Sequence, residues 1–278
     1  MARLFISDMD GTLLGMDSRV SEESAEIISR LSREGAWFTV ATARTPATVV
    51  PLMASTFTTL PAIVMTGAAL WDRNAGKFLE TRLFEPEVAR KTVESFLKYG
   101  INPFVYTVKD VSHLEVFHNG TMSRREENFY LDRKDMPLKR FVFDREKVYL
   151  DPPASTILLL GIGSNRSIFP LAEFLRANYD VSVSAYSDPI NRSIAYIEVF
   201  APGVSKSEAV KRLAERIGAD GITVYGDNIN DISMMEVADD AVAVANALPE
   251  VIDIADRVIG PNTESSVARD FLRICEEA

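Results

Sequence analysis

Short apolar runs alternate with amphipathic segments over roughly the first quarter of the chain. Residues 3–8, 37–42 and 61–65 are each rich in bulky apolar side chains and have the length of a buried strand. Between the first two runs, an amphipathic stretch begins at Ser21, a favoured helix-capping residue, and ends at Gly35. A second helical stretch separates the second and third runs. This strand–helix order predicts parallel strands joined by right-handed crossovers.

The pattern changes between about residues 70 and 195, where the chain is more polar and strand-like runs alternate irregularly with helical segments. After Pro202-Gly203 the regular alternation returns, with a helix predicted over 205–217 and a strand over 222–225. The sequence therefore predicts an α/β fold, with a doubly wound, mostly parallel sheet interrupted by an inserted α+β segment. We place the core domain at residues 1–82 and 196–278, and the inserted domain at residues 83–195.

Composition limits the expected partners and compartment. The chain has a net charge of −10 and no basic run, so we do not expect it to bind nucleic acid. Its single cysteine, Cys275, cannot form an intramolecular disulfide and fits a reducing cytoplasm. No apolar run approaches the length of a membrane span, and Asp8 interrupts the N-terminal run, unlike a signal peptide. We therefore expect a cytoplasmic protein that has no membrane partner.

Two carboxylates follow the first predicted strand. Asp8 and Asp10 stand two positions apart, and Gly11 then turns the chain. The carboxyl ends of strands are where open α/β sheets bind ligands. Two buried acids at this spacing require positive charge and can converge on one divalent cation, and such an aspartate can also act as a nucleophile toward phosphorus. Taken alone, the pair is also found in sugar-nucleotide transferases and in ordinary turns.

A second pair of acids follows a later predicted strand. Asp227 comes directly after the run that ends at Gly226, and Asp231 follows four residues later near a helix start. An unmatched carboxylate at the end of a buried strand is costly, which favours a role for Asp227. Asp231 has an alternative interpretation as a simple helix N-cap. Two strand ends that both carry acids suggest one shared metal site.

Two further residues stand at positions suited to binding a phosphate. Thr42 follows the second predicted strand and precedes a helix, where its hydroxyl and nearby N–H groups can hold an anion. Lys206 lies near the start of the helix that follows the insertion. The two histidines, His113 and His118, both lie in the predicted insertion, so we expect no histidine triad or zinc cluster on the core.

In this order, the motifs resemble the haloacid dehalogenase superfamily, and more narrowly its Cof-type (subfamily IIB) phosphatases, which carry a large α/β cap. The matching segments are Asp8-Met9-Asp10-Gly11-Thr12-Leu13-Leu14, Ala41-Thr42-Ala43-Arg44, Gly203-Val204-Ser205-Lys206 and Gly226-Asp227-Asn228-Ile229-Asn230-Asp231-Ile232-Ser233-Met234. The insertion matches the cap by position and length. Ala43 stands where the family usually has Gly, and Thr66-Gly67-Ala68 replaces the usual Asn-Gly-Ala, but no charged catalytic group is lost.

The resemblance implies a role for each matched residue. It makes Asp8 the nucleophile and Asp10 the general acid and base. It implies that the phosphoryl group is bound by Thr42, Ala43, Lys206 and Asn230. It also implies a Mg²⁺ ion held by Asp8, the backbone carbonyl of Asp10, Asp227 and, directly or through water, Asp231.

The function that follows from the resemblance is Mg²⁺-dependent hydrolysis of small phosphorylated metabolites, such as sugar phosphates, through an aspartyl-phosphate intermediate. The cap is expected to exclude water and to select the leaving group. Two alternatives remain open. One is a phosphomutase acting on sugar phosphates, and the other is a non-catalytic binding or regulatory protein that keeps the site.

Overall fold

The computed structural model describes residues 2–144, 151–188 and 191–277. The chain divides into two compact units, which we call the core unit (Met1–Glu80 with Ser205–Ala278) and the inserted unit (Thr81–Val204). None of the helices in the described part of the chain is long and apolar enough to cross a membrane.

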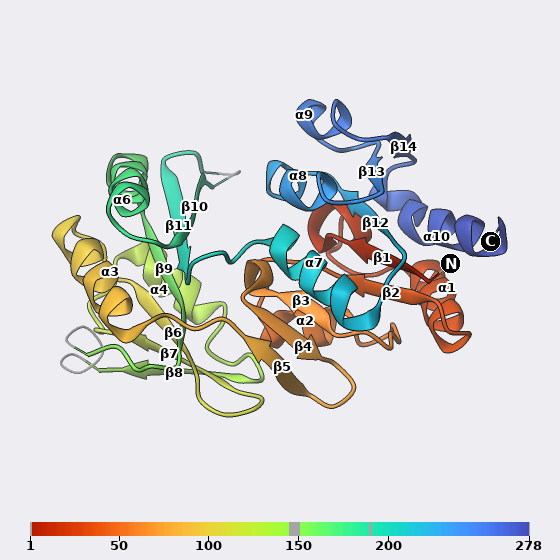
Figure 1. Ribbon diagram of the computed structural model, residues 1–278. Helices are drawn as coiled ribbons and strands as arrows, with labels where there is room; N and C mark the ends of the chain where they lie inside the picture. The colour runs from red at the N-terminus through yellow and green to blue at the C-terminus, as the bar shows by residue number, and fades with distance from the viewer. Residues whose placement is uncertain (1, 145–150, 189–190, 278) are drawn as a thin grey trace. The chain divides into compact units, whose positions relative to one another are not determined.

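A five-stranded sheet forms the centre of the core unit (Figure 1). Its strand order is β14–β13–β12–β1–β2, and each neighbouring pair is parallel. The strands are β1 (Arg3–Ser7), β2 (Trp37–Val40), β12 (Gly221–Gly226), β13 (Asp240–Val244) and β14 (Arg257–Ile259). The first strand of the chain therefore lies between strands from opposite ends of the sequence.

Apolar side chains on both faces explain why β1 is an interior strand. Leu4, Phe5 and Ile6 are successive residues, so they point to alternate faces, and each is at most 3% exposed. After β1 the chain adds β2 on one side of it. Later in the chain, β12 pairs with β1 on its other side, and β13 and β14 follow outward from β12. Right-handed crossovers then place the connecting helices on opposite faces, which confirms the predicted doubly wound α/β fold.

In the described part of the core unit, six helices accompany this sheet. Helix α1 packs against α10, and α7 packs against α8. Their bounds are α1 (Glu22–Arg33), α2 (Pro46–Leu52), α7 (Lys206–Ile217), α8 (Ile229–Met235), α9 (Pro249–Ile252) and α10 (Ser266–Glu277). Short helical turns span Met9–Leu13, Met65–Gly67 and Asn262–Glu264.

The third predicted strand joins the core sheet by a single bridge. It forms β3 (Ala62–Val64), and Ile63 makes an isolated parallel bridge to Ala41, just beyond β2. After β3 the chain reverses at Met65 and Thr66, which both have positive φ. Strand β3 is also a member of a separate small sheet. The other members of that sheet are β4 (Ala69–Asp72) and β5 (Lys77–Thr81).

The inserted unit contains a six-stranded sheet of order β10–β11–β9–β6–β7–β8, antiparallel except for the β7–β8 pair. Its elements are α3 (Pro86–Lys98), β6 (Phe104–Val108), β7 (Leu114–His118), α4 (Arg124–Leu131), β8 (Lys139–Phe143), β9 (Thr156–Ser164), α6 (Asn165–Asn178), β10 (Ser182–Ser187) and β11 (Ile194–Phe200). Apolar residues of α3 and α6 pack on one face of the sheet, against Ile197 and Val199 among others. This is the α+β segment that the sequence predicts.

The compact units divide at slightly different places from the predicted domains. The first division lies after Glu80 rather than after residue 82, and the second after Val204 rather than after residue 195. Strand β11 accounts for the second difference, because Ile194–Phe200 pairs with β9 and β10 on either side.

Candidate active site

Adjacent strands of the core sheet bring their carboxyl ends to one edge. Strand β1 lies between β12 and β2, and Ser7 is paired with Tyr225 on one side and Val40 on the other. Asp8 follows β1 directly, and its N–H donates to the Tyr225 carbonyl at 3.0 Å. Asp227 follows β12 in the same way. The parallel register therefore makes neighbours of acids that are far apart in the sequence.

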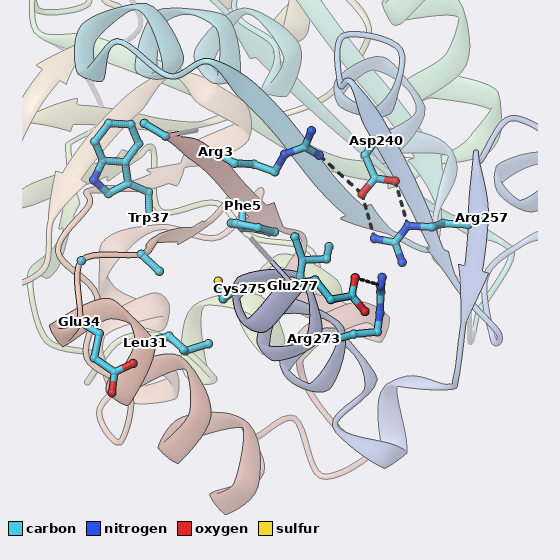
Figure 2. Close-up of a pocket in the computed structure, with 14 residues that line it drawn as sticks. Arg3, Phe5, Leu31, Glu34, Trp37, Asp240, Arg257, Arg273, Cys275 and Glu277 are labelled. Atoms are coloured by element: carbon cyan, nitrogen blue, oxygen red, sulfur yellow. Dashed lines mark hydrogen bonds and ion pairs between the residues drawn. The ribbon is translucent and has the colours of Figure 1, made fainter.

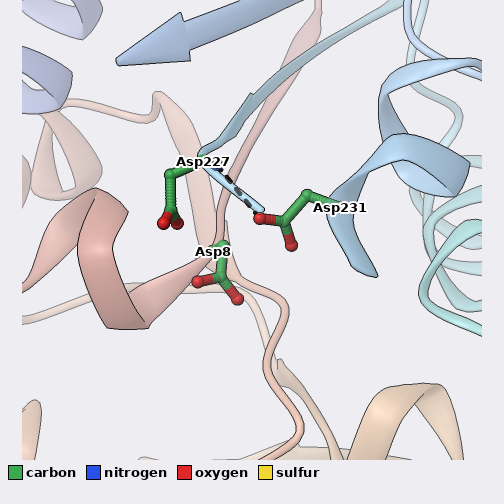
Figure 3. Close-up of side chains that lie close together, drawn as sticks. All are labelled: Asp8, Asp227 and Asp231. Atoms are coloured by element: carbon green, nitrogen blue, oxygen red, sulfur yellow. Dashed lines mark hydrogen bonds between the residues drawn. The ribbon is translucent and has the colours of Figure 1, made fainter. Parts of the chain in front are cut away.

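Lys206 connects two of these acids. It is the first residue of α7, and its side chain is 1% exposed. Its Nζ donates to Asp8 Oδ1 at 2.5 Å and to Asp231 Oδ1 at 2.7 Å. Figure 3 shows the side chains of Asp8, Asp227 and Asp231 converging from their separate segments. The structure thus brings together four of the predicted site residues.

Asp231 is more than a helix cap. The N-cap of α8 is Asn228, and Asp231 is the third helical residue, so the alternative interpretation of Asp231 as a simple N-cap is wrong. Its Oδ2 accepts the backbone N–H groups of Asp227 at 3.1 Å and of Asn228 at 3.0 Å. Its other oxygen accepts from Lys206, and the residue is fully buried. The Asp231 carboxylate therefore stabilises the start of α8 and also holds the Lys206 side chain in the site.

The acids of this cluster carry more negative charge than Lys206 balances. Burial raises the pKa of Asp8 to about 7, with a further contribution from Asp231 and Asp227, although the Lys206 ammonium opposes the shift. Burial likewise raises the pKa of Asp227 to about 6, against the hydrogen bond from Thr12. For Lys206 burial acts in the opposite sense, but the two carboxylates outweigh it and raise its pKa. A further positive charge would therefore stabilise the ionised acids.

The donor set is suited to a hard divalent cation. One oxygen from each of Asp8, Asp227 and Asp231 lies within 4.8 Å of the others. Carboxylate oxygens are the ligands that Mg²⁺ prefers in proteins. The turn beside them also leaves no room for a side chain, because a Cβ added to Gly11 would collide with the Asp227 carboxylate. Thr12 Oγ1 donates to Asp227 Oδ1 at 2.6 Å and fixes that carboxylate.

Asp10 has a different partner. Its carboxylate accepts Nε and Nη2 of Arg44 at 2.7 and 2.6 Å, a two-point ion pair, and the side chain of Asp10 is half exposed. It is not one of the three clustered carboxylates. The geometry separates the two acids of the first motif, since Asp8 is buried against Lys206 while Asp10 is oriented by a guanidinium.

The remaining predicted residues follow β2 or stand in the first turn of α8. Thr42 is buried beyond β2, and its Oγ1 accepts the N–H of Arg44 at 3.2 Å. Ala43 lies between them in the same turn. Asn230 is exposed in the first turn of α8, and no hydrogen bond of its side chain to the cluster is found within the described residues.

Sequence reasoning assigned no role to three residues that support the site. Arg44 and Thr12 both stand inside the matched motifs, so their position was a usable signal. Asn246 lies outside the four matched segments, in Val244-Ala245-Asn246-Ala247, which keeps the family pattern only in part. Its side-chain amide donates to the Gly11 carbonyl at 2.7 Å and holds the turn after Asp10 from the far end of the sequence.

Comparison with known proteins agrees with this geometry. A family model described as haloacid dehalogenase-like hydrolase matches residues 5–271. The 5-amino-6-(5-phospho-D-ribitylamino)uracil phosphatase YcsE of Bacillus subtilis is 27% identical over 269 residues, which cover 96% of this chain and 93% of that protein.

Solved structures show the same fold over nearly the whole chain. A haloacid dehalogenase-like hydrolase from Bacteroides thetaiotaomicron superposes with a TM-score of 0.77 at 21% identity, covering 99% of this chain and 100% of that one. The protein TM0651 from Thermotoga maritima has a TM-score of 0.76 at 25% identity, covering 98% and 97%. With a family match that spans both units and phosphatases among its relatives, the chain belongs to the haloacid dehalogenase-like hydrolases, as a phosphatase of the Cof type.

Proposed function

We propose that this phosphatase hydrolyses phosphate monoesters of small metabolites, such as sugar phosphates, with Asp8 as the nucleophile. The observation that carries the proposal is the buried arrangement of Asp8, Lys206 and Asp231, with Asp227 beside it. A carboxylate held against a lysine at a strand end can attack phosphorus and form an aspartyl phosphate. The name of the relative YcsE, a phosphatase of a phosphorylated ribityl compound, supports this substrate class.

In the proposed reaction, a carboxylate oxygen of Asp8 bonds to phosphorus as the bond between phosphorus and the leaving oxygen breaks. Asp10 gives its proton to that oxygen, and the alcohol departs. Asp10, now a carboxylate, takes a proton from water, whose oxygen attacks the same phosphorus and releases inorganic phosphate from Asp8. Two hydrogen bonds from Arg44 hold the Asp10 side chain in position for both steps.

The other residues position and neutralise the phosphoryl group. The Lys206 ammonium is directed at the Asp8 oxygen and would share its charge with the phosphoryl oxygens, while the Thr42 hydroxyl would donate to one of them. Asp8 and Asp227, with Asp231 and the backbone carbonyl of Asp10, would hold Mg²⁺. When bound, the cation supplies positive charge that offsets the crowded acids and the phosphate.

The Asp8→Asn variant tests this proposal. We expect kcat for phosphate release, measured with Mg²⁺ over a panel of phosphate esters, to fall at least a thousandfold because the nucleophile is lost. Asp240→Asn, at the opposite end of the same sheet, is the matched control and should retain kcat. Retained turnover in Asp8→Asn would exclude Asp8 as the nucleophile.

The same assay separates the hydrolase from a phosphomutase. A hydrolase releases inorganic phosphate from a monophosphate without an added bisphosphate, and water is the acceptor. A phosphomutase would isomerise the sugar phosphate with little release of phosphate. Isomerisation as the dominant reaction would overturn the proposed hydrolysis.

A further inference from the structure

A pocket of the core unit contains none of the proposed catalytic residues. It encloses about 340 Å³ where the C-terminal end of α1, the segment after α2 and the turn between β4 and β5 meet. We call it the arginine pocket, because Arg33 and Arg73 line it, together with Ser55, Thr56 and Phe57 among others. Within the described residues, no aspartate or glutamate belongs to its lining. In a chain whose net charge is −10, a pocket lined by positive charge alone needs an explanation.

Neutral acceptors hold Arg73 in this pocket. Its Nη1 donates to Thr58 Oγ1 at 3.0 Å. Its Nη2 donates to the backbone carbonyls of Met53, at the end of α2, and of Thr56, the latter at 2.7 Å. A guanidinium has five N–H donors, and these bonds use three of them. The Nε–H and one N–H of Nη1, which have no partner among the described residues, are therefore available to a ligand.

No acid neutralises the Arg73 guanidinium. Arg73 is partly buried, and burial lowers its pKa to about 10, with no carboxylate of the described chain opposing that shift. The neighbouring acid in the sequence, Asp72, instead accepts the backbone N–H groups of Asn74 and Ala75 at 2.9 Å each. A cation withdrawn from water without a negative partner is costly, so an anion bound beside Arg73 would stabilise the protein.

Arg33 supplies a second guanidinium that is not paired with an acid. It is the last residue of α1, its side chain is exposed, and its Cζ lies 5.1 Å from the centroid of the Phe57 ring. No ion pair or hydrogen bond of this guanidinium is found in the described part of the chain, whereas Arg30 on the same helix pairs with Glu34 at 3.6 Å. The contact with Phe57 holds the Arg33 charge at the pocket and leaves its N–H groups able to bind a ligand.

Hydrogen bonds between the walls of the pocket fix its shape. The Phe57 N–H donates to Ser29 Oγ at 2.9 Å, which connects the segment after α2 to α1. The Asn74 side-chain amide donates to the Thr58 carbonyl at 3.0 Å, which connects the β4–β5 turn to the same segment. Thr56 is 3% exposed, and its hydroxyl has no hydrogen-bond partner among the residues that the structure describes. The pocket is therefore formed in advance and contains an unused hydroxyl group.

We propose that the arginine pocket, through Arg33, Arg73 and Thr56, binds a small oxyanion, namely phosphate, a carboxylate ion or a small metabolite that carries one of these groups. Guanidinium groups match the geometry and charge of both oxyanions. Two positive charges disfavour a cation, and a neutral ligand would leave them unmatched. The volume suits a small molecule. The inference does not rest on the proposed phosphatase function, because none of the proposed catalytic residues lines this pocket.

A residue-resolved NMR titration of the full chain tests this proposal. Inorganic phosphate and succinate are added in separate experiments at millimolar concentrations, and the backbone amide signals of Ser55, Phe57 and Asn74 report on the pocket. We expect a saturable shift of these signals with at least one anion, and weaker binding at high salt because the attraction is electrostatic. Phosphate bound at the proposed active site would move the signals of Asp8 and Thr42 instead. A response to phosphate alone, to succinate alone or to both identifies the group that the pocket accepts.

The Arg33→Gln variant decides whether the pocket itself binds the anion. Its exposed side chain has no ion pair within the described residues, so we expect the variant to fold. Binding at the pocket should weaken about tenfold, because a charged contact with the anion is lost. Arg30→Gln, in the same last turn of α1, is the matched control and should keep the wild-type affinity. The absence of a saturable shift with either anion, or equal affinities in the two variants, would overturn the proposal.

Discussion

Charged side chains cluster at both ends of the core sheet. At only one of the two ends do positive side chains match the negative charge of the acids. At the amino ends of the strands, Arg257 forms ion pairs with Asp240 at 2.8 Å and with Asp270 at 2.7 Å, and Arg273 adds a bond to Asp270 at 2.9 Å. At the carboxyl ends, three carboxylates share the single ammonium of Lys206. In the first arrangement the acids and arginines pair with one another. In the second the acids carry excess negative charge, so a cation and, with it, a phosphate could still bind.

Pocket volume points to the opposite end of the sheet from the proposed site. A pocket of about 760 Å³ opens at the amino ends of the strands, where Arg3, Trp37 and Asp240 line it (Figure 2). Its arginines already face acids, as the dashed lines between Arg257 and Asp240 show. Unbalanced buried charge, rather than pocket volume, distinguishes the end of the sheet where we propose that catalysis takes place, called the catalytic end below.

The largest effect should come from removing the ammonium group that contacts Asp8 and Asp231. We expect Lys206→Met to lower kcat on the order of a thousandfold, because it removes a preorganised charge on the phosphoryl group and leaves Asp8 and Asp231 unmatched. Steady-state kinetics on the best substrate measure this loss. A variant that is folded and keeps wild-type kcat would show that Lys206 has only a structural role.

Mg²⁺ should stabilise the protein through the catalytic end alone. At a hundred times the dissociation constant, binding contributes about 2.7 kcal/mol, which thermal unfolding with and without EDTA would detect as a higher Tm. Asp227→Asn should reduce the shift, whereas Asp240→Asn should retain it. An equal shift in both variants would place the cation elsewhere.

The balanced end should matter for stability and not for turnover. We expect Arg257→Met to lower the free energy of unfolding by about 2 kcal/mol, because Asp270 is buried and loses its strongest partner. Bonds from Arg257 and Arg273 outweigh burial and hold the pKa of Asp270 below its ordinary value of 3.8. The wild-type contribution is therefore present above that pH and is lost as the pH falls below it, while the variant lacks it at neutral pH. Denaturant unfolding at two pH values measures both effects, and a loss of kcat would contradict the comparison.

The smallest effect concerns the orientation of Asp10. We expect Arg44→Lys to lower kcat/KM about tenfold, because a lysine keeps the charge but cannot make the two-point contact that positions the carboxylate. Arg269→Lys, which breaks a similar but exposed pair with Glu23, provides the control. Equal kinetics in the two variants would remove Arg44 from the proposed mechanism.

The sequence predicted the parts that depend on local pattern and strand order. Asp8 and Asp227 could be found because each follows an apolar strand, and parallel strands end at one edge. The pairing of Arg44 with Asp10 could not, since a long side chain reaches one of many partners depending on the packed structure. The apolar pattern of Ile194–Phe200 does not say which sheet the segment joins, so the domain boundary predicted after residue 195 fell inside β11.

The central place of β1 has a consequence for how the protein is made. Its neighbour β12 is synthesised near the end of the chain, and 215 residues separate Thr12 from the Asp227 carboxylate that it contacts. A nascent chain therefore holds β1 without its β12 partner until Gly221–Gly226 has been made, and by then every described strand of the inserted unit's sheet is complete. Asp8 is made among the first residues and acquires its partners late, so a chain truncated before Lys206 would lack Lys206 and Asp227 and could not assemble the proposed centre.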